Sequence, residues 1–155
     1  MQVVLLLEGV QSGCKKHPQY CDLLRVYDER WAESISGPIW ETVELLSSLQ
    51  QAGYRLYGLS NWSAEKFHLV RGQFEFLGCF EQIVISGEEC LVKPDPRILS
   101  RSLELAGAAA ADCLLIDDSL KNIDAACKLG FQVIHYQCPE QLRLDLIETG
   151  ILPAN

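Results

Sequence analysis

The chain has 155 residues and a formal net charge of −8 at pH 7, which argues against nucleic acid or an acidic membrane surface as its main partner. A chain of this length can bury one good core, and no break in composition divides it, so we predict a single domain over residues 1–155. No apolar run approaches the roughly 20 residues that cross a bilayer, and residues 3–7 are too few for a secretory signal.

Helical and strand patterns alternate along the chain. The helical patterns cover residues 18–34, 38–51, 64–71 and 96–106, and a last one ends at Gly130. The strand patterns cover residues 54–59 and 82–86, a run that starts at Cys113, and residues 131–136. Short strands that alternate with helices of this length favour parallel pairing through right-handed crossovers. We therefore predict an α/β fold with a doubly wound, three-layer parallel sheet.

The cysteines and histidines do not form a recognisable site. Seven cysteines are scattered along the chain without a C-x-x-C pair, and their spacings do not suit structural zinc. Cys113 and Cys127 lie inside apolar patterns, so we expect buried thiols in a reducing cytoplasm. The histidines are far apart in sequence, and His135 is expected to be structural because it lies within a predicted strand.

Two adjacent acids, Asp117 and Asp118, end the apolar run Leu114-Leu115-Ile116. The carboxyl ends of buried parallel strands are where open α/β sheets bind ligands. Two neighbouring carboxylates repel each other unless a cation or strong donors lie between them, and Mg²⁺ is the simplest candidate. Followed by Ser119, the pair is also a good helix N-cap sequence, so it leaves both interpretations open.

Ser60 and Lys93 add groups that suit an anion. Ser60 follows the strand pattern 54–59, so its hydroxyl is expected at another strand's carboxyl end. Pro94 biases Lys93 away from the helical region, which places the lysine in an extended loop before a helix. A helix cap and a solvated loop lysine are the structural alternatives. Together with the acid pair, however, these residues indicate a phosphate-handling site.

Three motifs, taken in this order, resemble the haloacid dehalogenase-like superfamily of hydrolases. They are Leu59-Ser60-Asn61-Trp62, Val92-Lys93-Pro94-Asp95-Pro96 and Ile116-Asp117-Asp118-Ser119. The resemblance covers roughly residues 22–146. It implies a Rossmann-like core, Mg²⁺-dependent hydrolysis of a phosphoester and a small phosphorylated or anionic substrate.

The resemblance also implies roles for single residues. Ser60 would be the phosphate-binding hydroxyl, with Asn61 beside it in the substrate site. Lys93 would balance the charge on the nucleophile and on the transferred group. Asp118 would bind Mg²⁺ directly, with Asp117 as a second ligand or a supporting acid. This acid pair favours phosphoester chemistry over the alternative, a 2-haloacid dehalogenase.

The chain departs from the superfamily at its first motif. Members begin with a strand that ends in Asp-x-Asp, in which the first aspartate is the nucleophile and the second the general acid/base. This chain contains no Asp-x-Asp, and its first aspartate is Asp22. We therefore expect hydrolysis to be impaired or absent. The alternative is a non-catalytic phosphate-binding, metal-binding or regulatory module. A response-regulator receiver domain is disfavoured, because no phosphoacceptor aspartate ends a strand between Lys93-Pro94 and the acid pair.

The N-terminal residues 1–36 allow two interpretations. The apolar run 3–7 could form a central strand that places Glu8 near the site, or it could belong to the remains of a helical cap. Five apolar residues cannot distinguish a strand from a buried helix. We favour the cap, because Lys15-Lys16-His17-Pro18 is similar to cap sequence in the family, and we assign residues 37–150 to the core. A missing central strand would expose sheet edges, which invites self-association.

Overall fold

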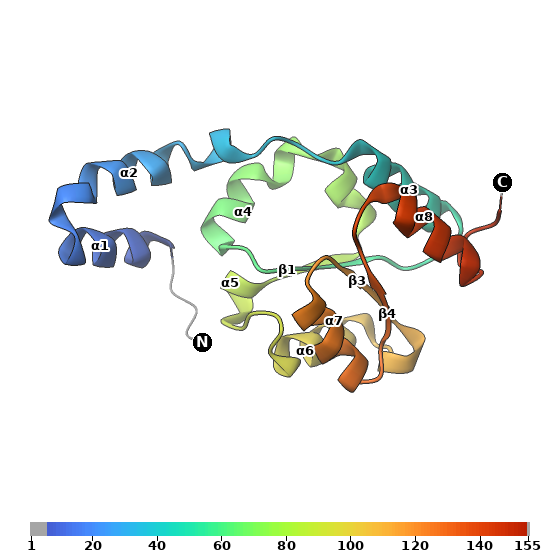
Figure 1. The fold of residues 1–155 in the computed structure, drawn as a ribbon. Helices are drawn as coiled ribbons and strands as arrows, with labels where there is room; N and C mark the ends of the chain where they lie inside the picture. The colour runs from blue at the N-terminus through green and yellow to red at the C-terminus, as the bar shows by residue number, and fades with distance from the viewer. Residues whose placement is uncertain (1–5, 155) are drawn as a thin grey trace.

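The computed structural model describes residues 6–154 as short parallel strands between layers of helices (Figure 1). The α-helices are α1 (Leu6–Lys16), α2 (Cys21–Glu29), α3 (Trp40–Gln51), α4 (Ala64–Val70), α5 (Ser86–Glu89), α6 (Pro96–Ala106), α7 (Leu120–Lys128) and α8 (Pro139–Glu148). The strands are β1 (Tyr57–Ser60), β2 (Gln82–Ile85), β3 (Leu114–Asp117) and β4 (Gln132–His135). Short 3₁₀ helices connect them: η1 (Pro18–Tyr20), η2 (Trp31–Ser34), η3 (Arg71–Gln73), η4 (Glu75–Cys79) and η5 (Ala110–Asp112).

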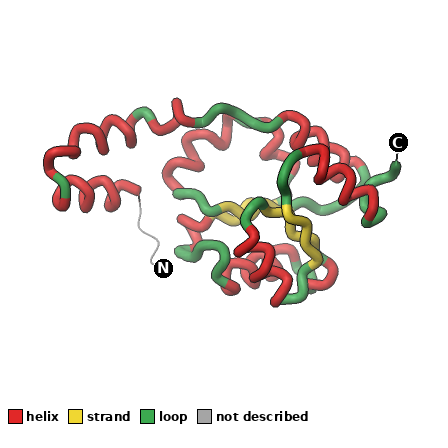
Figure 2. Tube along the Cα trace, viewed as in Figure 1, coloured by secondary structure: helices red, strands yellow, loops and turns green. Residues whose placement is uncertain are grey.

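The strands form two parallel pairs (Figure 2). In the first pair Ser60 of β1 lies opposite Ile85 of β2, and in the second Asp117 of β3 lies opposite His135 of β4. Within residues 6–154, β1 and β3 each have a strand partner on one side only. The predicted parallel α/β arrangement is therefore confirmed, but as two half-sheets.

Helices cover both faces of the strands and give the fold its three layers. Leu45 and Leu49 of α3 pack with Leu142 and Leu146 of α8 in one core cluster, to which β4 contributes Ile134. The second cluster joins α6 and α7 to β2 through Ile98, Leu99, Ala126 and Val84. In Figure 1, α3 and α8 lie above the strands and α6 and α7 lie below them.

The helix ends follow the signals in the sequence. Gly53 and Gly107 follow α3 and α6 with φ values of 88° and 60°, a left-handed conformation that glycine adopts at little cost. Pro96 opens α6, and the Asp95 side chain accepts a hydrogen bond from the Arg97 amide as the N-cap. The predicted boundaries 96–106 are those of α6.

Several expectations are corrected. The predicted helix 18–34 is broken into η1, α2 and η2, and α8 had no counterpart among the predicted elements. The expectation of buried thiols is wrong for Cys127, whereas Cys113 is partly buried against the second core cluster. Cys127 is exposed, because α7 turns Asn122, Ile123 and Ala126 inward instead. Cys14 and Cys21 form a disulfide that joins α1 to the start of α2.

The N-terminal region takes the helical form. Residues 6–16 form α1, which agrees with a cap helix and not with a core strand over residues 6 and 7. Residues 1–5, the rest of that prediction, lie outside the described part of the chain. The pair of α1 and α2, called here the helical hairpin, projects away from the layered part of the molecule (Figure 1).

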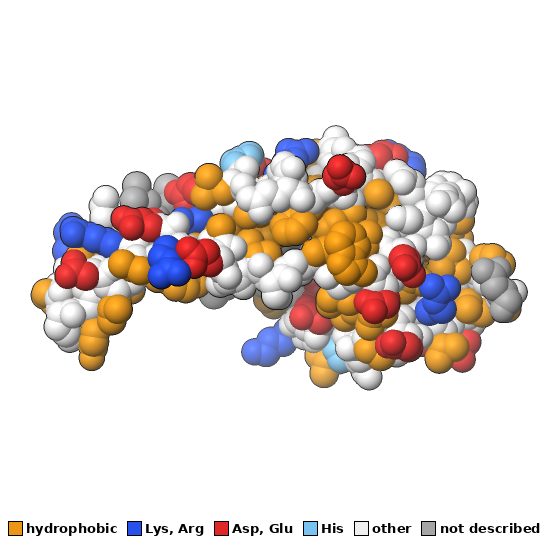
Figure 3. Space-filling view, turned by 90° about the horizontal axis from the view of Figure 1, so that it is seen from above, with side chains coloured by type: hydrophobic (Ala, Val, Ile, Leu, Met, Phe, Trp, Pro, Cys, Tyr) orange, Lys and Arg blue, Asp and Glu red, His pale blue; other side chains and the backbone are white. Residues whose placement is uncertain are grey.

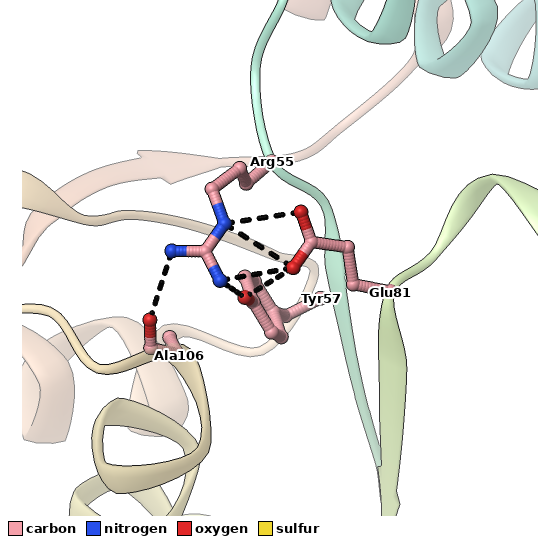
Figure 4. Close-up of polar contacts among 4 residues, drawn as sticks. All are labelled: Arg55, Tyr57, Glu81 and Ala106. Carbon is pink, nitrogen blue, oxygen red and sulfur yellow. Dashed lines mark hydrogen bonds and ion pairs between the residues drawn. The ribbon is translucent and has the colours of Figure 1, made fainter.

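A polar cluster fastens the amino ends of β1 and β2 (Figure 4). The Arg55 guanidinium forms an ion pair with Glu81 at 2.9 Å, donates to the Ala106 carbonyl at 3.1 Å and also contacts the Tyr57 hydroxyl. Tyr57 donates to Glu81 at 2.6 Å. This cluster ties the end of α6 to the strands at the edge opposite Ser60, so it supports the site without belonging to it.

Candidate active site

Lys93 is the centre of the candidate site. Its ammonium donates to the Leu59 carbonyl oxygen at 2.7 Å and to Asp117 Oδ2 at 2.6 Å. Leu59 belongs to β1 and Asp117 ends β3, so one side chain spans the two half-sheets at their carboxyl ends. The lysine and aspartate side chains are 11% and 4% exposed. The structural alternative, in which Lys93 is a solvated loop lysine without a role in a site, is therefore wrong.

Asn61 fixes the loop that carries this lysine. Its side-chain oxygen accepts from the Lys93 amide at 2.8 Å, and its amide nitrogen donates to the Lys93 carbonyl at 3.0 Å. Both polar groups of Asn61 are therefore used to hold backbone. Its assignment as a substrate-binding residue stays a prediction, and the structure gives it a positioning contact that sequence reasoning did not anticipate.

Ser60 stands between the two residues that contact Lys93. It is the last residue of β1. Its hydroxyl has no hydrogen-bond partner among residues 6–154, and the cap of α4 is Ser63, not Ser60. The hydroxyl is thus free to donate to an anionic oxygen at the strand end.

Asp117 is held in its ionised form by surrounding donors. Its Oδ1 accepts from the Ser119 amide at 2.9 Å and from Asn122 Nδ2 at 2.8 Å. Burial raises the pKa of Asp117, but the hydrogen bonds from Lys93, Ser119 and Asn122 outweigh burial and leave the pKa below its usual range. A carboxylate with both oxygens engaged in this way suits a supporting role.

Asp118 differs from its neighbour in being exposed. Its carboxylate forms no ion pair or hydrogen bond with another residue of the described chain. His135 Nε2 lies 3.0 Å from the Asp118 carbonyl oxygen, which can only accept, so the histidine holds the backbone here. An exposed carboxylate at a strand end, beside a second acid, fits Mg²⁺, which protein sites commonly bind through one or two carboxylates plus water and phosphate. No cluster of three metal-binding side chains occurs among the residues described.

Asn122 is the residue that sequence reasoning missed. It is 7% exposed and reaches Asp117 from the first turn of α7. A buried asparagine on the inward face of a helix five residues after an acid is the signal that points to such a contact. In the sequence, α7 is predicted only as the helical pattern that ends at Gly130, without a role for Asn122.

A depression in the described surface lies away from these residues. It has a volume of about 480 Å³ and is lined by His135 of β4 and by Gln141, Asp145, Glu148 and Thr149 around α8, among others. None of the predicted site residues lines it. Its two carboxylates make it unsuited to a phosphate.

The chain belongs to the haloacid dehalogenase-like hydrolases. The model of this family matches residues 7–136, and the match includes the three motifs at the Lys93 centre. The fold and the site thus define a haloacid dehalogenase-like core, as the sequence motifs indicate.

Individual relatives give the family match more detail. A phosphoglycolate phosphatase of Mesorhizobium japonicum is 30% identical over 119 residues, which cover 72% of this chain and 51% of the relative. A sesquiterpene phosphatase of Aspergillus oryzae is 31% identical over 59% of this chain and 46% of the relative. The chain therefore spans about half the length of these curated relatives.

Solved structures share the fold. A family enzyme of Bacteroides thetaiotaomicron in complex with magnesium and inorganic phosphate superposes with a TM-score of 0.57 and 28% identity, over 64% of this chain and 52% of that one. A family hydrolase of Deinococcus radiodurans reaches a TM-score of 0.72 over 96% of this chain and 77% of that one, at 19% identity.

Proposed function

We propose that the chain carries the phosphate-binding and metal-binding part of a Mg²⁺-dependent phosphoester hydrolase. One observation carries this proposal. The Lys93 ammonium donates both to the Leu59 carbonyl of β1, next to Ser60, and to Asp117 of the acid pair. Phosphatases among the relatives and a magnesium–phosphate complex among the similar structures support it. The substrate proposed is a small phosphorylated compound.

Each residue has a chemical task in this proposal. The Ser60 hydroxyl donates to a phosphoryl oxygen, and the Lys93 ammonium neutralises negative charge on the same group. Asp118 would hold Mg²⁺ with the support of Asp117, and the ion would supply further charge neutralisation. Asn61 and Asn122 keep Lys93 and Asp117 in place.

We further propose that the chain alone does not turn over. Its sequence lacks the Asp-x-Asp motif that supplies the family's nucleophile. The half-sheets support this proposal, because β1 and β3 are not paired with each other in the described chain. Self-association through these strand edges remains part of the proposal. Among the described residues, no helix is long and apolar enough to span a bilayer, and a cytoplasmic location stays a prediction.

Binding and turnover can be measured separately. We expect Mg²⁺ and inorganic phosphate together to raise the melting temperature of the wild-type chain, and Asp118→Asn to abolish the Mg²⁺-dependent part of the shift. Asp124→Asn, a change of an exposed acid on α7, is the matched control. Hydrolysis of p-nitrophenyl phosphate should stay at the buffer rate. Robust turnover would contradict the missing nucleophile, and the absence of any shift would contradict the phosphate site.

The second candidate is a binding module that retains the site without catalysis. The contacts of Lys93 favour it too, because they form between β1, Asn61 and Asp117 without any contribution from a nucleophile. Adding the missing Asp-x-Asp motif distinguishes the hydrolase part from the binding module. A hydrolase part should gain turnover when the missing motif is restored, whereas a binding module should not.

A further inference from the structure

The helical hairpin is joined to the layered part of the molecule near the end of α2. α1 packs against α2, and the Cys14–Cys21 disulfide closes the turn between them. Within α1, a Cβ added to Gly13 would lie 2.8 Å from a Leu24 methyl carbon, so the two helices approach closely at this point. After α2 the chain passes through η2, which contacts α4.

Lys66 of α4 contacts three groups at the end of α2 and the start of η2. Its ammonium lies 2.8 Å from Asp28 Oδ1 and donates to the Asp28 carbonyl oxygen at 2.7 Å. It also lies 5.9 Å from the centre of the Trp31 ring. The lysine side chain is 11% exposed and that of Asp28 is 25% exposed, so water screens these contacts only in part.

All three groups attract a cation. The carbonyl groups in the last turn of a helix carry partial negative charge, the Asp28 carboxylate carries a full one, and the face of an indole ring is electronegative. The Lys66 ammonium therefore fixes the turn from α2 into η2 against α4. We call this set of Lys66, Asp28 and Trp31 the latch.

Trp62 connects the latch to the candidate site. Its ring lies 5.8 Å from that of Trp31 and 5.6 Å from that of Phe67, both edge-on. Its carbonyl oxygen accepts from the Ser86 hydroxyl at 3.1 Å and from the Gly87 amide at 3.0 Å. Trp62 follows directly after Ser60 and Asn61. Its backbone is held by β2 and α5, while its side chain contacts Trp31 of η2, the segment that follows the hairpin.

We propose that Lys66 is a positioning residue that holds the helical hairpin beside the carboxyl end of β1, and that the Trp31–Trp62 contact transmits the position of the hairpin to the Ser60–Asn61 turn. The first half follows from the latch alone. The second half rests on the proposed function, because it takes Ser60 as a phosphate-binding residue.

Hydrogen exchange tests the first half. Lys66→Met keeps most of the apolar length of the side chain and removes the charge. We expect the amides of residues 21–34 to exchange about tenfold faster in this variant, with little change in α6 and α8. Asp28→Asn, which retains the backbone carbonyl and Trp31, should give a smaller increase in the same segment. Lys128→Met, a change of an exposed lysine of α7, is the control and should leave residues 21–34 unchanged.

Two results of this experiment would overturn the latch. Unchanged exchange in residues 21–34 would show that Lys66 does not hold the hairpin. An equal increase in every segment would show that Lys66 stabilises the whole fold and does not position one part of it. A double variant of Lys66→Met and Asp28→Asn should show no further increase beyond Lys66→Met, because both changes act on one contact.

Tryptophan fluorescence tests the second half. A Trp40→Phe background leaves Trp31 and Trp62 as the reporters. In this background, inorganic phosphate with Mg²⁺ should change the emission, and Lys66→Met should weaken the apparent phosphate affinity. Equal affinity in the two proteins would overturn the link between the hairpin and the turn. If the parent protein binds no phosphate, the proposed function fails, while the exchange experiment still decides the latch.

Discussion

At the scale of single residues, the charged pairs of this protein differ mainly in their access to water. The Lys93 and Asp117 side chains are 11% and 4% exposed, whereas Arg97 of the Asp95–Arg97 pair is 73% exposed. Exposed pairs contribute little to stability because solvent screens them. Removing one partner of a buried pair leaves a charge without compensation. The loss of the Lys93–Asp117 pair should therefore cost more stability than the loss of an exposed pair.

Lys93→Met is expected to lower the free energy of unfolding at pH 7 by about 3–5 kcal/mol, because Asp117 stays buried without its cation. The loss should shrink in acid, where Asp117 takes up a proton. Urea denaturation of the variant at neutral and acid pH measures both effects. Lys128→Met, a change of an exposed lysine of α7, serves as the control and should change stability little. A neutral-pH loss no larger than that of the control would contradict the buried pair.

Asn122→Ala is expected to lower the free energy of unfolding by about 1–3 kcal/mol, since it removes a buried donor to Asp117. Asp124→Ala changes an exposed position on the same helix and should have little effect. Denaturation of both variants gives the comparison. Equal stability of the two would mean that the Asn122 contact contributes nothing.

How far the site could be predicted differs between its residues. Ser60 and Asp117 were predicted correctly at strand ends, because apolar runs that stop at polar residues mark those ends. Lys93 was predicted in an extended loop because of Pro94, and it lies in a turn shortly before α6. The contacts of Asn61 with the Lys93 backbone and of Asn122 with Asp117 were not predicted. These contacts join loops that are distant in sequence or hold a side chain inside the fold, and periodicity carries no information on such pairings.

At the scale of elements, prediction succeeded where local signals agree. α6 has a proline in its first turn, an aspartate N-cap and a glycine after its end, and its boundaries were predicted without error. The apolar spacing over 18–34 continues through a region in which the helix is interrupted at Tyr20 and at Arg30. Periodicity reports the buried face and misses such breaks. α8 has a weaker apolar pattern, and no helix was predicted over its residues.

The Asp95 cap gives a prediction about pH. Hydrogen bonds from the Arg97 side chain and amide lower the pKa of Asp95 to about 2, against about 3.9 in an unfolded chain. Because the folded value is the lower one, the carboxylate stabilises the fold above about pH 4, and this contribution is lost as the pH falls toward about 2. Asp95→Asn keeps a good cap but has no charge. The stability difference between wild type and variant, measured by denaturation, should therefore be present at pH 7 and disappear between about pH 4 and 2. A difference that does not change with pH would contradict the lowered pKa.

At the scale of the whole molecule, two features stand out: the projecting hairpin and the two half-sheets. The outer surface of the hairpin carries exposed apolar side chains, including Leu23 at 68% and Tyr27 at 58%, and Figure 3 shows hydrophobic atoms on this projecting end.

The half-sheets are covered by helices on both faces, so a strand between β1 and β3 would be buried on both sides. Buried parallel strands are apolar throughout. The prediction of one domain over 1–155 awaits a direct test.

The half-sheets lead to the last prediction, which concerns the absent nucleophile. We expect a synthetic peptide with an apolar strand that ends in Asp-x-Asp to bind between β1 and β3 and to give turnover of p-nitrophenyl phosphate in the presence of Mg²⁺. A strand that pairs with both edges satisfies backbone groups on each side. Amides of β1 and β3 should exchange more slowly once the peptide is bound. The control peptide carries asparagine in place of the first aspartate, so it should protect the same amides without turnover. Protection by neither peptide would show that the inner edges do not accept a strand, and protection without turnover by the Asp-x-Asp peptide would favour the binding module over the hydrolase.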